Sequence, residues 1–299
     1  MHVKNAIVPV AGIGTRLLPS TKSQPKEMLP VGRKPVVQYV FEELGEAGIG
    51  RVLFVTGRGK HTIEDHFDPD VELRQMLEAD KGKRSLLREL DFERHNVRVF
   101  YTRQSEPRGL GDAILHGRAF AEGSPFVVAL GDSIIMAKDH TNIITRLVEC
   151  FEQRKARCVI ALEEVPHKEV FRYGIAEPAS TGKSAQQGDV FELRDLIEKP
   201  APAKAPSNLA VAGRYVMSAE IFDILERTKP GKDNEVQLTD AIRALLKEKG
   251  GVYGVRLAPG EKRYDIGNIE SYFRSFVEFA LRDPDYGAGL RKHLKGLLQ

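Results

Sequence analysis

A short apolar run at residues 6–10 leads directly into a segment with two glycines two residues apart, Gly12 and Gly14. Short apolar runs rich in β-branched residues and bounded by turn residues are typical of buried strands. Prolines at positions 19 and 25 prevent a regular helix from following this strand at once. The sequence therefore predicts a buried strand followed by an irregular loop of about twenty residues, and loops of that length in compact domains are usually functional.

The residues of this loop indicate what it binds. Glycines let a backbone approach a ligand closely, so that amide N–H groups can face phosphate oxygens. Arg16 and Lys26 add positive charge, and we interpret the loop as one that binds a nucleoside triphosphate. It is neither a dinucleotide-binding fingerprint, because Leu17 stands where a third glycine is required, nor a P-loop, because it contains no Gly-Lys-Ser/Thr. The alternative is an ordinary glycine-containing turn with solvated basic residues.

Composition narrows the class of protein. The 299 residues are 41% hydrophobic and 29% charged, which is ordinary for a globular protein. A net charge of +3 does not predict nucleic-acid binding. The two cysteines, Cys150 and Cys158, have no metal-ligand spacing and are expected to be buried thiols. The sequence shows no signal segment and no apolar run long enough to span a membrane, so we expect a cytoplasmic protein.

The first half of the chain alternates predicted strands and helices. We expect strands at 5–10, 51–56, 97–101 and 126–130, and helices at 35–47, 62–67 and 112–121. A charged segment at 71–94 also has helical periodicity. This alternation predicts a Rossmann-like α/β fold, in which a mostly parallel mixed sheet is flanked by helices on both faces.

The second half has more β character. We expect strands at 158–163, 210–217 and 252–257, and a pair at 173–177 and 190–198 joined by a Gly/Ser-rich loop at 180–188. Helices are expected at 141–153, 219–227, 239–249 and 269–282, the last of them closing the chain. We predict a single domain over residues 1–299, with a nucleotide-binding half at about 1–140 and a sugar-binding half at about 141–299.

Two aspartates occur where a ligand site is expected. Asp132 follows the predicted strand at 126–130, and in open α/β sheets ligands bind beyond the carboxyl ends of the strands. A carboxylate there can hold Mg²⁺ on phosphate oxygens. Asp265, in Tyr-Asp-Ile-Gly, would be a second carboxylate on the same ion. The alternative for both is a turn-forming or capping aspartate.

Two further pairs of residues have a pattern suited to ligand binding. Glu198 and Lys199 stand before Pro200, which ends a predicted strand, so that the lysine can neutralise a phosphate and the glutamate can accept hydrogen bonds from hydroxyl groups. Gln104 has an amide that can pair with a base edge, and Gly109 lets the backbone approach a base. A solvated Glu-Lys pair and a Gly/Pro turn are the respective alternatives.

Together these segments resemble the sugar nucleotidyltransferases, and among them most closely the bacterial UTP–glucose-1-phosphate uridylyltransferases. The resemblance covers nearly the whole chain and is carried by segments 9–16, 25–30, 63–68, 109–113, 197–200, 206–210, 213–216 and 235–241. Segments 9–16 and 197–200 are typical of the wider family, whereas 67–68 and 237–240 resemble the uridylyltransferases. Ser133 and Ile266 depart from the usual pattern; relatives often carry Asn and Cys at these positions.

The resemblance implies a role for each matched residue. The triphosphate of UTP would be bound by Ala11, Gly12, Gly14, Thr15, Arg16 and Lys26, and uracil by Gln104 and Gly109. Glucose 1-phosphate would be bound by Gly174, Glu198, Lys199 and Val211, and Mg²⁺ by Asp132 and Asp265. Arg16, Lys26 and Lys199 would act on the reacting phosphates. We also expect a homo-oligomer, a dimer or a tetramer.

The reaction implied is transfer of a uridylyl group from UTP to glucose 1-phosphate, which releases pyrophosphate. Two alternatives remain at this stage. One is a thymidylyl- or adenylyltransferase acting on a related sugar 1-phosphate. The other is a non-catalytic regulatory homologue that binds a sugar nucleotide, although the presence of Arg16, Lys26, Asp132 and Lys199 argues against it.

Overall fold

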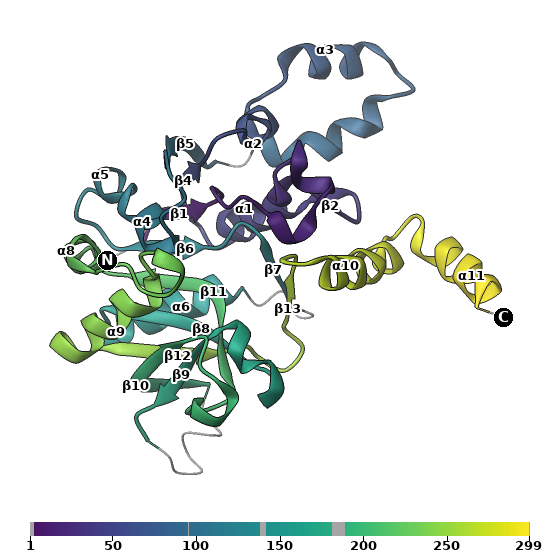
Figure 1. Cartoon of the computed structure of the whole chain (residues 1–299). Coiled ribbons are helices and arrows are strands. Elements are labelled where there is room, and N and C mark those ends of the chain that lie inside the picture. The colour runs from purple at the N-terminus through teal and green to yellow at the C-terminus, as the bar shows by residue number, and fades with distance from the viewer. Residues whose placement is uncertain (1–2, 95, 138–141, 181–188, 299) are drawn as a thin grey trace.

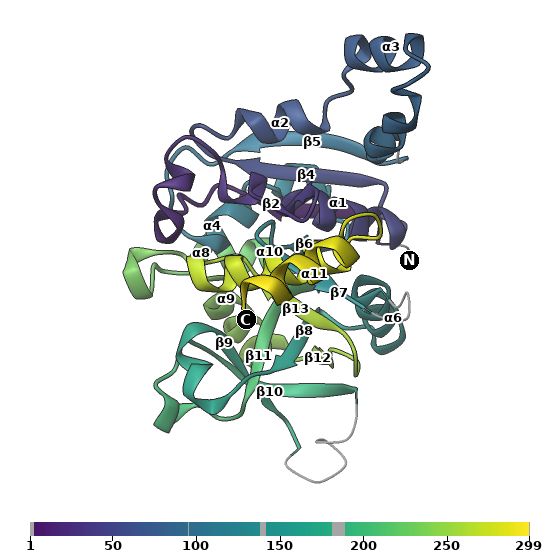
Figure 2. The ribbon, with the colours of Figure 1, turned by 90° about the vertical axis from the view of Figure 1, so that its right-hand side faces the viewer.

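The computed structural model describes residues 3–94, 96–137, 142–180 and 189–298. Its central element is a nine-stranded sheet with the order β5-β4-β1-β6-β11-β8-β12-β10-β9 (Figures 1 and 2). In chain order these strands are β1 (Asn5–Pro9), β4 (Arg51–Thr56), β5 (Arg98–Arg103), β6 (Phe126–Ala129), β8 (Cys158–Glu164), β9 (Gly174–Pro178), β10 (Val190–Glu198), β11 (Leu209–Met217) and β12 (Val252–Arg256).

The strand directions confirm the predicted sheet. Strands β5, β4, β1 and β6 pair in parallel, and β8 pairs in parallel with β12. Strand β11 is antiparallel to β6 and β8, and β10 is antiparallel to β12 and β9. Among the described strands of this sheet, β11 and β10 are therefore the only two that are antiparallel to the rest. The molecule is a mixed α/β domain with a mostly parallel sheet.

Helices cover both faces of the sheet because successive strand side chains point to opposite sides. Ala6 and Val8 of β1 belong to one core, which packs against α1 (Val36–Glu46), α2 (His61–Phe67) and α6 (Ile143–Arg154). Ile7, between them, belongs to the opposite core, which packs against α4 (Leu110–Leu115), α8 (Glu220–Arg227) and α9 (Leu238–Lys249). Strands buried on both faces explain the nearly continuous apolar runs in the sequence.

The second half follows the predicted pattern. Strands β9 and β10 form the expected antiparallel pair, in which Gly174 lies opposite Glu198 and Ile175 opposite Ile197. Most of the loop predicted between them lies outside the described residues. Short 3-10 helices occur at η5 (His167–Arg172), η6 (Pro202–Lys204) and η7 (Lys232–Asn234).

A second, two-stranded sheet was not predicted. Strand β7 (Ser133–Met136) starts one residue after Asp132 and pairs antiparallel with β13 (Lys262–Asp265), so that Ser133 lies opposite Asp265. The two halves of the chain are thereby joined beside the carboxyl end of β6. A third small sheet joins β2 (Pro30–Val31) to β3 (Lys34–Pro35), within the connection predicted as irregular.

Three predicted helices were wrong in extent. The helix expected at 112–121 is divided into α4 and α5 (Arg118–Ala121), because a Cβ on Gly117 would lie only 2.3 Å from the side chain of Ile7 and the chain turns there against the sheet. The segment 71–94 forms α3 (Val71–Ala79) and then a 3-10 helix, η4 (Arg84–Arg94). Helix α10 (Ile269–Arg282) does not close the chain, because α11 (Gly287–Leu297) follows it.

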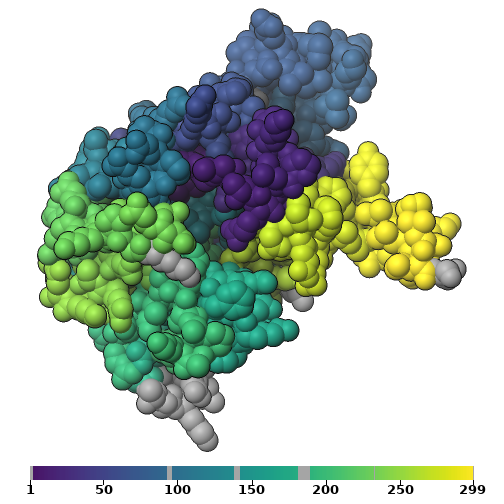
Figure 3. Space-filling model, viewed as in Figure 1, coloured from purple at the N-terminus to yellow at the C-terminus, as the bar shows by residue number. Residues whose placement is uncertain are grey.

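Two parts of the chain stand out from the body. Segment α3–η4 projects at the top of Figure 1, and α10 and α11 extend to one side, as the space-filling view also shows (Figure 3). Among the described helices, none combines the length and the apolar character that crossing a membrane would require.

Both cysteines are buried and free, as predicted. Burial raises the pKa of Cys150 to about 11, and burial also raises the pKa of Cys158 above its usual value. Each thiol is therefore protonated at neutral pH, and a protonated thiol is a poor nucleophile and metal ligand.

Candidate active site

A cleft of about 570 Å³ lies between the loop after β1 and the β9–β11 region. Its lining brings together predicted residues from both halves of the chain, namely Arg16, Asp132, Gly174, Glu198, Lys199, Val211 and Asp265. The other predicted residues do not line this cleft; these are Ala11, Gly12, Gly14, Thr15, Lys26, Gln104 and Gly109. Most of these belong to the phosphate loop, residues 11–29, which adjoins the cleft through Arg16.

The phosphate loop is ordered by three short 3-10 helices, η1 (Thr15–Leu17), η2 (Ser20–Lys22) and η3 (Lys26–Met28). Gly14 precedes η1 in the left-handed conformation, with φ of 74°, which glycine adopts without strain. The hydroxyl group of Thr21 donates a 2.7 Å hydrogen bond to the Gly14 carbonyl and holds this turn. The loop is therefore a built structure, which argues against a solvated turn.

The glycines of the loop face its lysine. A Cβ on Gly12 would lie 3.3 Å from Cε and 3.4 Å from Nζ of Lys26. Behind the loop, a Cβ on Gly57 would lie 3.1 Å from the carbonyl oxygen of Ala11, so the end of β4 packs closely against it. The backbone of the loop and the ammonium group of Lys26 thus lie side by side, which is the arrangement expected of a phosphate site.

Lys26 is paired with the predicted metal ligand. Its Nζ lies 2.5 Å from Oδ2 of Asp132. Burial alone lowers the pKa of Lys26, but the negative charges of Asp132 and Glu27 outweigh it, so this pKa lies above its usual value. Burial raises the pKa of Asp132, but the ammonium group of Lys26 outweighs it and holds that pKa below its usual range. Both groups are therefore charged at neutral pH.

A second ion pair, which the sequence analysis missed, lies behind the first. Lys60 Nζ donates to Glu27 Oε2 at 2.8 Å, and the two side chains are 6% and 1% exposed. Glu27 follows Lys26 in η3, and Lys60 precedes α2. This pair therefore anchors the turn of the phosphate loop that carries Lys26 to the start of α2.

The two predicted metal-binding aspartates lie at adjacent strand ends. Asp265 ends β13, and the amide of Ile266 donates a 3.2 Å hydrogen bond to the carbonyl of Asp132. The Oδ1 atom of Asp265 also accepts a hydrogen bond from the Gly267 amide at 2.8 Å, so the turn-forming alternative applies as well. Two carboxylates fit Mg²⁺, which usually binds through one or two carboxylates plus substrate phosphates. Among the described residues no group of three or more candidate ligands occurs.

Arg263 is a further cleft residue that the sequence analysis missed. Its guanidinium lies 3.7 Å from Asp265, is bonded to Glu163 and stacks over the ring of Tyr173, 4.8 Å from its centre. Burial alone lowers the pKa of Arg263, but Glu163 and Asp265 outweigh it and this pKa lies above its usual value. Arg263 therefore connects the aspartate pair with the wall that carries Gly174.

The predicted sugar-binding residues form one wall of the cleft. A Cβ on Gly174 would lie 3.3 Å from Glu198 Oε2, from the Val211 side chain and from the hydroxyl of Thr239, so a larger residue here would crowd these three side chains. Thr239 donates a 2.7 Å hydrogen bond to Glu198 and thereby orients the carboxylate. Thr239 was within a segment noted for its resemblance, but no role was predicted for it.

Lys199 lies at the rim of this wall with its backbone in an unusual conformation. Its φ is 43°, a left-handed value that is uncommon for residues other than glycine and often marks functional sites. The conformation is held because the Lys199 amide donates to the carbonyl of Tyr173 at 3.0 Å. Its Nζ lies 3.4 Å from Glu198 Oε1, and the side chain is 36% exposed. The ammonium group is therefore accessible to a ligand in the cleft.

Gln104 and Gly109 lie together but outside the cleft lining. The amide nitrogen of Gln104 donates to Asp112 at 2.6 Å and to the Gly109 carbonyl at 3.2 Å, and the residue is buried. Gly109 has φ of 100°, and a Cβ there would lie 2.7 Å from Cβ of Glu235. Close packing against residues 235–236 is thus one reason for a glycine at this position.

The chain as a whole matches a known family of proteins. Residues 5–280 match the model of the nucleotidyl transferase family. The chain is a nucleotidyl transferase. One relative is the UTP–glucose-1-phosphate uridylyltransferase of Staphylococcus epidermidis. The two sequences are 43% identical over an alignment that covers 99% of this chain and 98% of the relative.

Solved structures agree with this assignment. A UDP-glucose pyrophosphorylase from Acinetobacter baumannii has a TM-score of 0.88 and 34% identity, and covers 99% of the nucleotidyl transferase and 100% of that chain. A UTP-bound structure from the same organism has a TM-score of 0.87 and 36% identity over 98% and 99% of the two chains. The resemblance inferred from the motifs is confirmed over almost the full length.

Proposed function

We propose that the enzyme transfers the uridylyl group of UTP to glucose 1-phosphate, giving UDP-glucose and pyrophosphate. The observation that carries this proposal is the meeting of two charged sets at one cleft. The phosphate loop contributes Arg16 to the cleft, and its Lys26 pairs with Asp132, a cleft residue that follows β6. The opposite wall contributes Lys199 and Glu198. Similarity to uridylyltransferases across the whole chain supports the choice of UTP and glucose 1-phosphate.

The proposed reaction needs little proton chemistry. A sugar phosphate has its second pKa near 6, so its oxygen is mostly ionised at neutral pH and can attack the α-phosphorus of UTP directly. The main difficulty is to bring two anions together, and positioning with electrostatic stabilisation is the usual solution in phosphoryl transfer. Lys199 would neutralise the sugar phosphate, Lys26 the transferred phosphoryl group, and Arg16 the departing pyrophosphate.

Asp132 and Asp265 would hold the divalent cation, which when bound supplies positive charge to the reacting phosphates. The chain's own contribution is to keep the backbones of the two aspartates close together, because β7 pairs with β13 and the Ile266 amide donates to the Asp132 carbonyl. Glu198, oriented by Thr239, would accept hydrogen bonds from sugar hydroxyl groups, and a glycine at position 174 lets the backbone of β9 lie close to Glu198 and Thr239. The amide oxygen of Gln104 would accept from the N–H of uracil.

The experiment is a pyrophosphate-release assay with UTP, dTTP and ATP, each combined with glucose 1-phosphate and Mg²⁺. We expect UTP to give the highest kcat/KM. Asp132→Ala should abolish Mg²⁺-dependent turnover with the far-UV circular dichroism retained, while Asp223→Ala, which removes an exposed carboxylate on α8, should keep parent activity. Preference for another nucleotide, or tight UDP-glucose binding without turnover, would contradict the proposal.

We also propose a cytoplasmic homo-oligomer. The homo-oligomer is supported by the C-terminal region, where Phe273, Tyr286 and Leu298 are 60%, 68% and 87% exposed. This region projects from the body of the molecule (Figure 3). Large apolar patches on a protein surface often mark interfaces. Light scattering after gel filtration should give a dimer or tetramer, and a mass near that of one chain would contradict this.

A further inference from the structure

Arg214, on β11, is a charged residue with no exposed surface at all. Its guanidinium donates to three backbone carbonyls, those of Ser133 at 2.7 Å, Leu130 at 3.3 Å and Gly213 at 3.2 Å. Leu130 and Ser133 stand on either side of the Gly131–Asp132 turn. The buried cation therefore holds both ends of the short turn that carries Asp132.

The charge of Arg214 is balanced by a residue from a different element. Nε and Nη2 of Arg214 donate to Oε2 of Glu43, on α1, at 3.0 and 2.7 Å. Burial raises the pKa of Glu43 above its usual value even though Arg214 opposes that shift. A buried ion pair of this kind is often no more stabilising than apolar residues of the same volume, so its presence is weak evidence for a role in stability alone.

The remaining contacts of the turn show why an exact position is needed. A Cβ on Gly131 would lie 2.5 Å from the side chain of Val10, so this part of the turn is already against β1. The carbonyl of Asp132 accepts from Ile266, and its carboxylate contacts Lys26. Asp132 thus has partners from two loops, and it can meet both only if the turn beneath it stays fixed.

We propose that Arg214, held by Glu43, is a positioning residue that sets the place of the Asp132 carboxylate relative to Lys26 and Asp265. This rests on the proposed function, because it assumes that Asp132 holds the divalent cation. Arg214 touches no substrate; it acts through the Leu130 and Ser133 carbonyls. Residues that orient metal ligands in this indirect way typically change metal affinity or activity by about 10–100-fold when replaced.

The test uses Mn²⁺ binding to the full chain in the presence of UDP-glucose, followed by electron paramagnetic resonance, together with kcat, KM and thermal unfolding. Arg214→Met should weaken Mn²⁺ binding by about tenfold or more and lower kcat at saturating UTP. Arg214→Lys, which keeps the charge but offers fewer directed donors, should be intermediate. Val52→Ala, in the core at the far end of β4, should lower stability with unchanged Mn²⁺ affinity.

Two outcomes would overturn the proposal. In the first, Arg214→Met lowers the melting temperature as Val52→Ala does but leaves Mn²⁺ affinity and kcat at the parent values. This result would mean that the role of Arg214 is purely structural. If Arg214→Met does not fold, Glu43→Gln decides, because it keeps the guanidinium and its carbonyl contacts while weakening their anchor. If Glu43→Gln weakens Mn²⁺ binding, by less than the roughly tenfold expected for Arg214→Met, the proposal is supported. If Glu43→Gln binds Mn²⁺ with the parent affinity, the proposal is overturned; this is the second outcome.

Asp132→Ala separates this proposal from the one on which it rests. If Asp132→Ala leaves Mn²⁺ binding unchanged, the assignment of Asp132 to the cation fails. If Asp132→Ala abolishes binding and the Arg214 and Glu43 variants do not change it, only the positioning role fails.

Discussion

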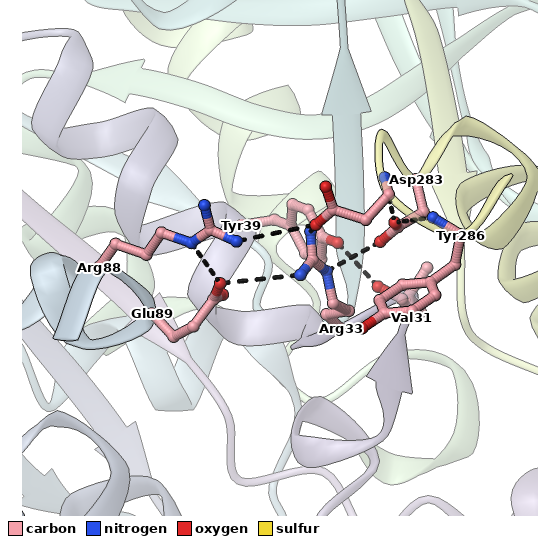
Figure 4. Close-up of polar contacts among 8 residues, drawn as sticks. Val31, Arg33, Tyr39, Arg88, Glu89, Asp283 and Tyr286 are labelled. Carbon is pink, nitrogen blue, oxygen red and sulfur yellow. Dashed lines mark hydrogen bonds and ion pairs between the residues drawn. The ribbon is translucent and has the colours of Figure 1, made fainter. Parts of the chain in front are cut away.

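Ion pairs occur in two contrasting regions of this enzyme, beneath the phosphate loop and at the turn between α10 and α11. Beneath the loop, Glu27 and Lys60 are almost completely buried. At the turn, Arg33 lies 2.8 Å from Asp283, 3.2 Å from Asp285 and 3.7 Å from Glu89, and its side chain is 40% exposed (Figure 4). Both regions pair a basic side chain with carboxylates, but the surroundings of these ion pairs differ.

The surroundings determine what each region contributes. Removing one partner of a buried pair leaves an uncompensated charge away from water, which is strongly destabilising. Exposed pairs contribute little on average, since water and salt screen them. The outer network joins the β2–β3 hairpin to η4 and the C-terminal helices, whereas the inner pairs hold Lys26 and Asp132, for which we propose roles in the reaction. We therefore expect substitutions to have very different effects in the two regions.

The largest effect is expected from Glu27→Leu. It leaves Lys60 buried without its partner, and the free energy of unfolding should fall by about 3–5 kcal/mol. Urea unfolding measures this change. The double variant Glu27→Leu with Lys60→Met is the control, because it removes both charges and should recover most of the loss. A fall of less than about 1 kcal/mol in the single variant would show that this pair behaves like an exposed one.

Lys199→Ala tests a charge that is partly exposed but lies in the cleft. We expect kcat/KM for glucose 1-phosphate to fall by an amount equivalent to about 3 kcal/mol, as when a preorganised donor to a transition state is removed. Stability should be nearly unchanged, because Lys199 makes few contacts beyond Glu198. Lys204→Ala, on nearby η6, is the matched control. Parent values of kcat and KM in Lys199→Ala would refute the assignment.

A smaller, selective effect is expected from Gln104→Ala. Loss of an acceptor for the uracil N–H should lower kcat/KM for UTP by about 1–2 kcal/mol more than for ATP, which has no equivalent N–H at that edge. The uracil and thymine edges are alike, so dTTP should be affected as UTP is. Steady-state kinetics with the three nucleotides measure this. Equal losses for all three would mean that Gln104 supports only the turn at Gly109 and Asp112, to which it is bonded.

The features predicted from sequence were local ones. Strand β4 was predicted at its observed bounds, because an apolar β-branched run needs no partner to be recognised. Asp132 was found as a carboxylate after a strand, and Gly12 and Gly14 as glycines in a loop, since spacing along the chain alone indicates them. The meeting of Gly174 and Glu198 followed from predicting their two strands as a pair.

The features that were missed depend on partners distant in sequence. Strand β7 is only four residues long, and nothing near it indicates that β13 pairs with it. Glu27 and Arg214 were assigned no role from the sequence, because burial of a charge becomes visible only when its partner is placed beside it. Helix α11 was missed since three glycines, at 287, 289 and 296, lower its helical propensity.

Arg33→Ala should have the smallest effect and completes the comparison. After the substitution the charges of Glu89, Asp285 and Arg88 stay solvated, since their side chains are 41%, 49% and 65% exposed. Asp283 is only 11% exposed, but its carboxylate keeps the hydrogen bonds that it accepts from the amides of Asp285 and Tyr286. We expect a melting temperature within about 2 °C of the parent, and a difference that shrinks further in 0.5–1 M salt, where the screening length is roughly 3–4 Å. Scanning calorimetry at low and high salt measures both. A large fall in melting temperature that does not depend on salt would mean that this network behaves like the buried pairs. Burial would then not explain the difference between the two regions.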